Sequence, residues 1–128
     1  MNRPAKQGLT ERELEVMHAF WKHGEITAAE ARDRLAKQNV DIAYVTVANL
    51  VRILVEKNYL KAVNATRPFR YRTVRSFEDV SGNLVGDLVK RVFHGSREQL
   101  LVQVLGGKRR LTAKERALLE QVLEEQSK

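Results

Sequence analysis

The sequence predicts a mainly α-helical protein with one small β-hairpin. Three observations support this fold class. Apolar residues recur at helical spacing in two blocks of the chain. Ser and Thr residues stand at the positions that begin helices. Between the two blocks the pattern changes from helical to alternating, which is typical of strands.

Four helix starts are marked by a Ser or Thr followed three residues later by Glu or Gln, which is the capping-box pattern. It occurs at Thr10 with Glu13, Thr27 with Glu30, Ser96 with Gln99 and Thr112 with Glu115. In the first half of the chain, the pattern and the periodicity predict helices over residues 11–22, 28–38 and 44–57. Asn58 follows the third helix, where a left-handed cap residue is expected.

The first helix carries a predicted core-facing stripe of Leu14, Met17 and Trp21. His18 falls on this stripe, so we expect a partly buried, hydrogen-bonded histidine and not a metal ligand. Residues 25–27 are expected to be a short extended link to the second helix.

Two strands are predicted after the third helix, over residues 59–63 and 69–74. In the second strand, aromatic and basic residues alternate. Phe69 and Tyr71 should therefore share one face of the sheet, and Arg70 and Arg72 the other.

Three helices followed by a two-stranded hairpin is the element order of a winged helix-turn-helix domain, which we assign to residues 1–75. In that architecture the third helix enters the DNA major groove and the hairpin lies beside it. One side of the third helix is apolar and suits the core. The other side carries Asn and Arg, which pair with adenine and guanine, and small apolar groups that can contact a thymine methyl. The candidate DNA-binding residues are Tyr44, Val45, Thr46, Ala48, Asn49 and Arg52 on the helix, and Arg67 and Arg70 on the wing.

The charge distribution favours a polyanionic partner such as double-stranded DNA. The net charge is +7, and residues 1–75 hold 14 Lys and Arg against 8 Asp and Glu. Residues 76–128 hold 9 against 8, so they are nearly neutral. A concentrated positive field of this kind attracts nucleic acid.

Residues 76–128 are predicted to be a helical region with three short apolar stripes. About fifty residues in three pieces close a core poorly by themselves. The stripes would therefore pair with a second chain, giving a homodimer, or pack back on the N-terminal domain. The candidate dimer-interface residues are Leu84, Leu88, Val92, Leu100, Leu101, Val104, Leu118, Leu119 and Val122.

Other chemistry is not indicated. The chain has no cysteine, which excludes disulfides and thiolate metal sites. His18 and His23 are not at the spacing of a helical metal pair, and no phosphate loop or nucleophile motif is present. We therefore expect no enzyme activity, no cofactor and no metal. Without a long apolar run or a signal peptide, we expect a cytoplasmic protein and no membrane contact.

Three stretches, LTERELEVMHAFWKHGEITAAE, AYVTVANLVRILVEKNYL and RPFRYR, resemble the family of penicillinase and methicillin-resistance repressors, which includes copper-responsive relatives. The resemblance extends over nearly the whole chain. Tyr44, Thr46 and Val47 match the start of the family's recognition helix, whereas Val45 and Asn58 depart from the usual residues. The resemblance implies a homodimeric repressor on an inverted-repeat operator, dimerised through its C-terminal helices.

The resemblance also implies how repression is relieved. In family members tied to β-lactam resistance, a membrane sensor with a zinc protease domain triggers cleavage of the repressor at an Asn-Phe pair. Gln103 and Val104 stand at that place here, so the candidate cleavage site departs from the family motif. The Cys-rich tail of the copper-responsive relatives is absent.

Two other functions remain open from the sequence. A ligand-responsive winged-helix regulator would need an apolar pocket between the two parts of the chain. A winged helix used only as a protein-interaction module would show no salt-dependent affinity for DNA.

Overall fold

The computed structural model describes residues 8–107 and 109–126. The chain divides into two compact units, with the boundary between Ser81 and Gly82. The sequence assigned the boundary to residue 75, which lies just before helix α4 (Phe77–Arg91). The first turn of α4 therefore belongs to the N-terminal unit.

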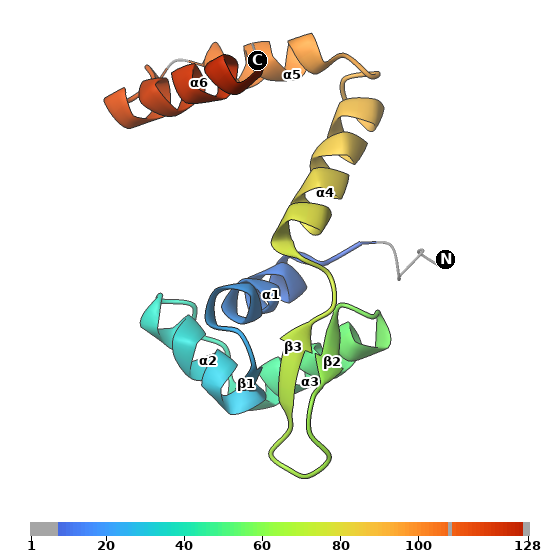
Figure 1. The fold of residues 1–128 in the computed structure, drawn as a ribbon. Helices are drawn as coiled ribbons and strands as arrows, with labels where there is room; N and C mark the ends of the chain where they lie inside the picture. The colour runs from blue at the N-terminus through green and yellow to red at the C-terminus, as the bar shows by residue number, and fades with distance from the viewer. Residues whose placement is uncertain (1–7, 108, 127–128) are drawn as a thin grey trace. The chain divides into compact units, whose positions relative to one another are not determined.

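The N-terminal unit has the predicted order of three helices followed by a hairpin (Figure 1). Its elements are α1 (Glu11–His23), β1 (Ile26–Thr27), α2 (Ala28–Lys37), α3 (Tyr44–Glu56), β2 (Leu60–Ala62) and β3 (Arg70–Thr73).

The sheet has one strand more than the sequence predicts. Its order is β1-β3-β2, with both pairings antiparallel. In the predicted link over residues 25–27, Ile26 pairs with Tyr71, and Thr27 pairs with Arg70. Two residues are too few to show an alternating pattern, so only the folded chain reveals this strand.

The capping boxes predicted at the starts of α1 and α2, and the left-handed residue predicted after α3, are present in the structure. In α1, the Glu13 amide donates to Thr10 Oγ1 over 3.1 Å, and the Thr10 amide donates to Glu13 Oε1 over 3.0 Å. The same reciprocal pair closes the start of α2. Asn58 has a φ of 66°, which confirms the left-handed residue expected after α3.

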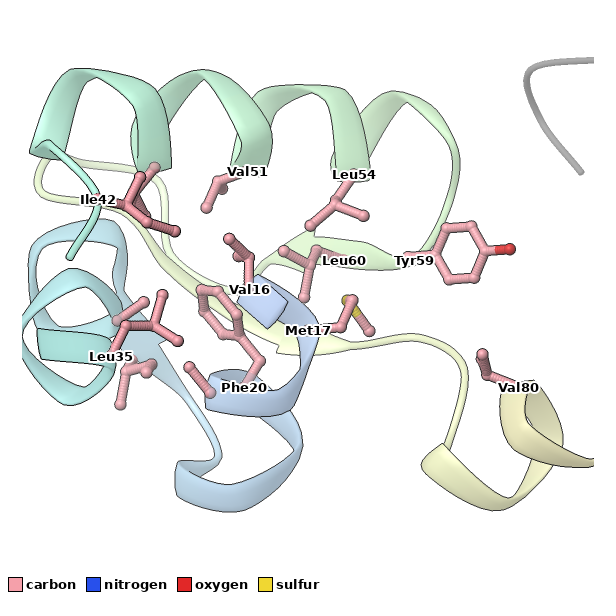
Figure 2. Close-up of a cluster of buried hydrophobic side chains, with 14 residues drawn as sticks. Val16, Met17, Phe20, Leu35, Ile42, Val51, Leu54, Tyr59, Leu60 and Val80 are labelled. Atoms are coloured by element: carbon pink, nitrogen blue, oxygen red, sulfur yellow. The ribbon is translucent and has the colours of Figure 1, made fainter. Parts of the chain in front are cut away.

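The core of the N-terminal unit lies between α1, α2, α3 and the sheet. Figure 2 shows labelled side chains of these elements converging there, among them Phe20, Leu35 and Leu54. The stripe predicted on α1 is only partly right. Met17 is fully buried, but Leu14 and Trp21 are half-buried, and the other buried apolar residues of α1 are Val16, Ala19 and Phe20.

His18 is exposed, so the prediction of a partly buried histidine is wrong. The neighbouring Trp21 lies at the edge of the core, where its Nε1 donates to the Arg75 carbonyl over 2.9 Å. This hydrogen bond fixes the segment that leads into α4. Val80 of α4 is buried at one end of the core cluster (Figure 2).

The wing has the predicted alternation. Phe69 and Tyr71 are half-buried, whereas Arg70 and Arg72 are exposed. The loop between β2 and β3 projects away from the helices (Figure 1). Asn64 closes this loop, because its Oδ1 accepts from the Arg70 amide over 2.8 Å while its Nδ2 donates to two loop carbonyls.

After the wing come α4, α5 (Arg97–Leu105) and α6 (Ala113–Gln126). Ser96 caps α5, and Thr112 with Glu115 forms the predicted pair at the start of α6. Within the described ranges, no helix is both long and apolar enough to cross a membrane.

Candidate nucleic-acid interface

Helix α3 is fixed by one face and open on the other. Val47, Val51 and Leu54 are buried in the core. Burial of three large apolar side chains at helical spacing sets the rotation of the helix about its axis. The opposite face is consequently held towards solvent in a defined orientation.

The open face of α3 holds the predicted contact residues. Tyr44, Thr46, Asn49 and Arg52 are exposed, and Ala48 is half-buried. Val45 is 75% exposed, so it has no role in the core. An apolar, β-branched side chain in the first turn of such a helix is suited to a thymine methyl.

Arg52 lies in a small polar network along the helix. Its Nη2 donates to Asn49 Oδ1 over 2.6 Å, and its Nη1 donates to Glu56 Oε2 over 3.0 Å. Both ends of the Arg52–Glu56 pair are exposed. An exposed pair contributes little free energy, so Arg52 can exchange it for a ligand at little cost.

The first turn of α3 is open to an anion. Its N-cap residue, Ala43, makes no side-chain hydrogen bond, and the turn contains no acidic residue. By contrast, α1 and α2 begin at capping threonines. Free amides and the helix dipole at such an end suit a phosphate.

A groove of about 620 Å³ separates α3 from the wing and the start of α2. It brings together four of the predicted residues, Tyr44, Ala48, Arg52 and Arg67. Val45, Thr46 and Asn49 lie on α3 outside its lining. The groove also contains residues that the sequence reasoning missed: Thr27, Ala28, Ala29, Pro68 and Phe69. The capping box of α2 marks three of these positions, since residues at a helix start carry open amides.

The two wing arginines differ in their contacts. Arg67 lies over the Phe69 ring, with 5.6 Å between its Cζ and the ring centroid. Arg70 is held on the protein, because its Nη2 donates to the Glu25 carbonyl over 2.6 Å and its Nη1 lies 3.7 Å from Glu30 Oε1. Arg67 is therefore the freer of the two cations.

Glu30 stays charged beside Arg70. The hydrogen bond from the Thr27 amide has the largest effect and lowers the pKa of Glu30. Burial raises this pKa, and the positive charge of Arg70 is among the further effects that lower it. The contact between β1, α2 and the wing therefore persists at neutral pH.

The predicted dimer-interface residues lie on all three C-terminal helices. Leu100 and Leu119 are half-buried. The others are exposed: Leu84, Leu88, Val92, Leu101, Val104, Leu118 and Val122. The C-terminal unit also has a largely apolar groove of about 500 Å³, to which Val104, Leu118, Leu119 and Val122 contribute. Exposed apolar residues that the prediction omitted are Val85, Val102, Leu105 and Leu123.

The candidate cleavage pair, Gln103 and Val104, lies in the second half of α5, and both side chains are exposed. No residue of α5 is buried. In the described part of the chain, no three His, Asp or Glu side chains gather in a way that could hold a metal ion.

The order of the helices, the open face of α3 and the wing define a winged helix-turn-helix protein with a helical C-terminal region. The family model described as "Penicillinase repressor" matches residues 9–125, and the chain belongs to that family. No curated protein sequence matches the chain.

Two of the similar solved structures, each with a TM-score of 0.50, support this fold. The solution structure of the DNA-binding domain of the repressor BlaI is 26% identical with a TM-score of 0.50, covering 62% of this chain and 93% of that one. Bacillus licheniformis BlaI, in its monomeric form with the blaP half-operator, is 28% identical with a TM-score of 0.47, covering 56% and 87%. A MarR family protein from Bacillus stearothermophilus is 16% identical with a TM-score of 0.50, covering 96% and 76%.

Proposed function

We propose that this protein is a sequence-specific DNA-binding repressor that binds an inverted-repeat operator as a homodimer. The open face of α3, with Arg52 and Arg67 lining one groove, is the observation that carries the proposal. Membership of the penicillinase repressor family supports it. So does the likeness to a BlaI domain described as DNA-binding. Such a regulator is not an enzyme, needs no cofactor and works in the cytoplasm.

In this proposal α3 lies in the major groove. Asn49 and Arg52 meet base edges, and Val45 meets a thymine methyl. The open amides at the start of α3 and the guanidinium of Arg67 meet phosphates, which fix the position of the domain on the duplex. Arg70 acts mainly by holding the wing against β1, since Glu25 already accepts from its guanidinium.

The exposed apolar side chains of α4, α5 and α6 support the homodimer. Val92 is 61% exposed and Val104 is 65% exposed. Many such residues on short helices form surface that a monomer seldom leaves uncovered. A second copy of the same region covers it symmetrically and places two α3 helices for two half-sites.

The test is a binding titration of the full chain against a palindromic duplex selected from a random pool and against a scrambled duplex, over a series of salt concentrations. We expect a strong preference for the selected duplex and a steep salt slope, because phosphate contacts release counterions. Salt-dependent binding without preference would contradict sequence-specific repression. No binding to either duplex would favour the protein-interaction module.

We further propose that proteolysis of α5 relieves repression, with a sensor-controlled metalloprotease as the partner. The exposed side chain of Gln103 supports this, because Gln103 is not among the candidate dimer-interface residues of α5. The chain has Gln103 and Val104 where the family has Asn-Phe, so the double variant Gln103→Asn, Val104→Phe should be cleaved faster than the natural chain. Equal cleavage of both chains at another bond would contradict this site.

A further inference from the structure

A second hollow of about 470 Å³ lies on the N-terminal unit, between α1, the end of α2 and the first residue of α4. None of its lining residues lines the groove beside α3. Its floor includes Ala19 and Leu35, which belong to the buried core. The hollow is thus a separate feature of the domain, and its volume lies in the range of about 300–1,000 Å³ that small-molecule sites occupy.

One wall of the hollow is aromatic. The ring centroid of Trp21 lies 5.3 Å from that of Phe77 and 5.4 Å from that of His18, and both pairs are nearly edge to face. The hydrogen bond from Trp21 to the Arg75 carbonyl fixes the indole. Phe77 is 45% exposed, so part of a large apolar ring is available to a ligand.

The other wall is basic. Lys22, His23 and Arg34 line it, and Lys37 is close enough to act on His23. Burial lowers the pKa of His23, and the charges of Arg34, Lys22 and Lys37 lower it further. Among the residues described, Lys22, Arg34 and Lys37 form no ion pair. Cations at helix C-termini often serve the helix dipole alone, but here Lys22 and Arg34 line an aromatic hollow.

We propose that this hollow binds a small aromatic carboxylate, whose ring packs against Trp21 and Phe77 and whose carboxylate meets Arg34 and Lys22. The aromatic wall offers edge-to-face contact with a ring, and the guanidinium offers a charge-assisted hydrogen bond to the carboxylate. A neutral aromatic compound would lack the second contact, and an inorganic anion the first. The inference goes beyond the proposed repressor function and does not depend on it.

The site differs from the one that a ligand-responsive regulator was expected to need. That expectation required an apolar pocket between the two parts of the chain. This hollow is lined only by residues of the N-terminal unit. Phe77, however, begins α4, so a bound ligand would touch the helix that continues into the C-terminal unit.

Ligand binding at this site can be followed by tryptophan fluorescence, because Trp21 is the only tryptophan of the chain. We would titrate the full-length protein with benzoate and follow Trp21 fluorescence, with benzyl alcohol as the neutral aromatic probe and acetate as the non-aromatic anion. We expect a saturable change with benzoate and at least about tenfold weaker binding of either other probe, since each loses one class of contact. A linear, non-saturating response to benzoate, or equal responses to the three probes, would overturn the proposal.

Charge variants test the basic wall. Arg34→Gln and Lys22→Gln should each weaken benzoate binding, with about a tenfold loss for Arg34→Gln. Lys61→Gln, on β2 and outside the hollow, removes the same charge and should leave binding unchanged. Calorimetric titration of the same variants separates binding from collisional quenching. An equal loss in all three variants, or none in any, would overturn the assignment of the carboxylate to Arg34 and Lys22.

Discussion

The buried pair of Glu13 and Lys57 is the main electrostatic contact inside the N-terminal unit. Lys57 Nζ lies 2.8 Å from Glu13 Oε1, and the two side chains are 9% and 5% exposed. Lys57 Nζ also donates to the Gly8 carbonyl over 3.1 Å. Because Glu13 belongs to the capping box of α1, the pair ties the start of α1 to the end of α3.

Removing one partner of this pair should be costly. Lys57→Met leaves the Glu13 carboxylate buried without its cation, so we expect a loss of about 3 kcal/mol in the free energy of unfolding. The measurement is urea unfolding of the full chain. Arg12→Met is the matched control, because it breaks the exposed pair with Glu15 and should cost about 0.5 kcal/mol. Equal losses of stability in the two variants would contradict a larger contribution from the buried Lys57–Glu13 pair than from the exposed Arg12–Glu15 pair.

The same pair predicts a pH dependence of stability. Burial raises the pKa of Glu13, but the hydrogen bond and charge of Lys57 and the bonds at Thr10 outweigh it, so the pKa is below the usual 4.5. A carboxyl whose folded pKa is lowered stabilises the fold above its unfolded pKa. That stability is lost as the pH falls from about 4.5 through the lower folded value.

Comparing the natural chain with Glu13→Gln tests this dependence. Gln has no charge to titrate, so the stability difference between the two proteins should shrink on acidification below pH 4.5, the usual value for Glu. Chemical unfolding at neutral pH and at several acidic values would measure it. A difference that stays constant with pH would show that Glu13 does not titrate as inferred.

Among the elements, the proposed function gives α3 contacts with base edges and the wing contacts with phosphates. Arg52→Ala should cost about 1–3 kcal/mol of specific binding if Arg52 reads a base. Binding to the selected and scrambled duplexes would measure the specificity ratio. Arg12→Ala, which removes an exposed arginine from α1, is the control and should leave the ratio unchanged. An unchanged ratio for Arg52→Ala would assign Arg52 to the phosphates.

The two arginines of the wing, Arg67 and Arg70, should respond differently to substitution by alanine. Arg67→Ala should weaken binding to all duplexes about equally and lower the salt slope by about one, because Arg67 is free to meet a phosphate. Arg70→Ala should instead lower the melting temperature, because it loses the bonds to Glu25 and Glu30 that hold the wing. A fall in melting temperature for Arg67→Ala alone would reverse these assignments.

At the level of the complete chain, the contrast between the two units supports the proposed dimer interface. The N-terminal unit has a continuous buried core, whereas α5 and α6 have no buried residue. A fragment ending at Ser81 keeps Val80, which completes the core. It should be a monomer and bind the selected duplex more weakly than the full chain, because its two half-site contacts are no longer linked.

Sedimentation of the fragment and of the full chain would measure the difference. A stable dimer of the fragment would contradict an interface on α4, α5 and α6. A full chain that sediments as a monomer at the concentrations used for DNA binding would contradict the homodimer itself. Circular dichroism of the fragment provides the control, since a folded fragment is needed for either conclusion.

Features that depend on neighbouring residues could be predicted from the sequence. The starts of α1 and α2, the left-handed Asn58 and the alternation of the wing follow from capping chemistry, backbone sterics and side-chain period. The residues on the open face of α3 followed in the same way, because helical periodicity separates a buried stripe from an exposed one.

Contacts between residues far apart in the sequence became known only from the folded chain. Lys57 meets Glu13 across 44 positions, and Trp21 meets the Arg75 carbonyl across 54. The pairing of β1 with β3, the contact of Arg70 with Glu25 and the burial of Val80 are of the same kind. No local pattern marks such partners, because each contact depends on how the whole chain packs. For that reason the exposed His18 and the aromatic hollow beside it were not predictable from the sequence.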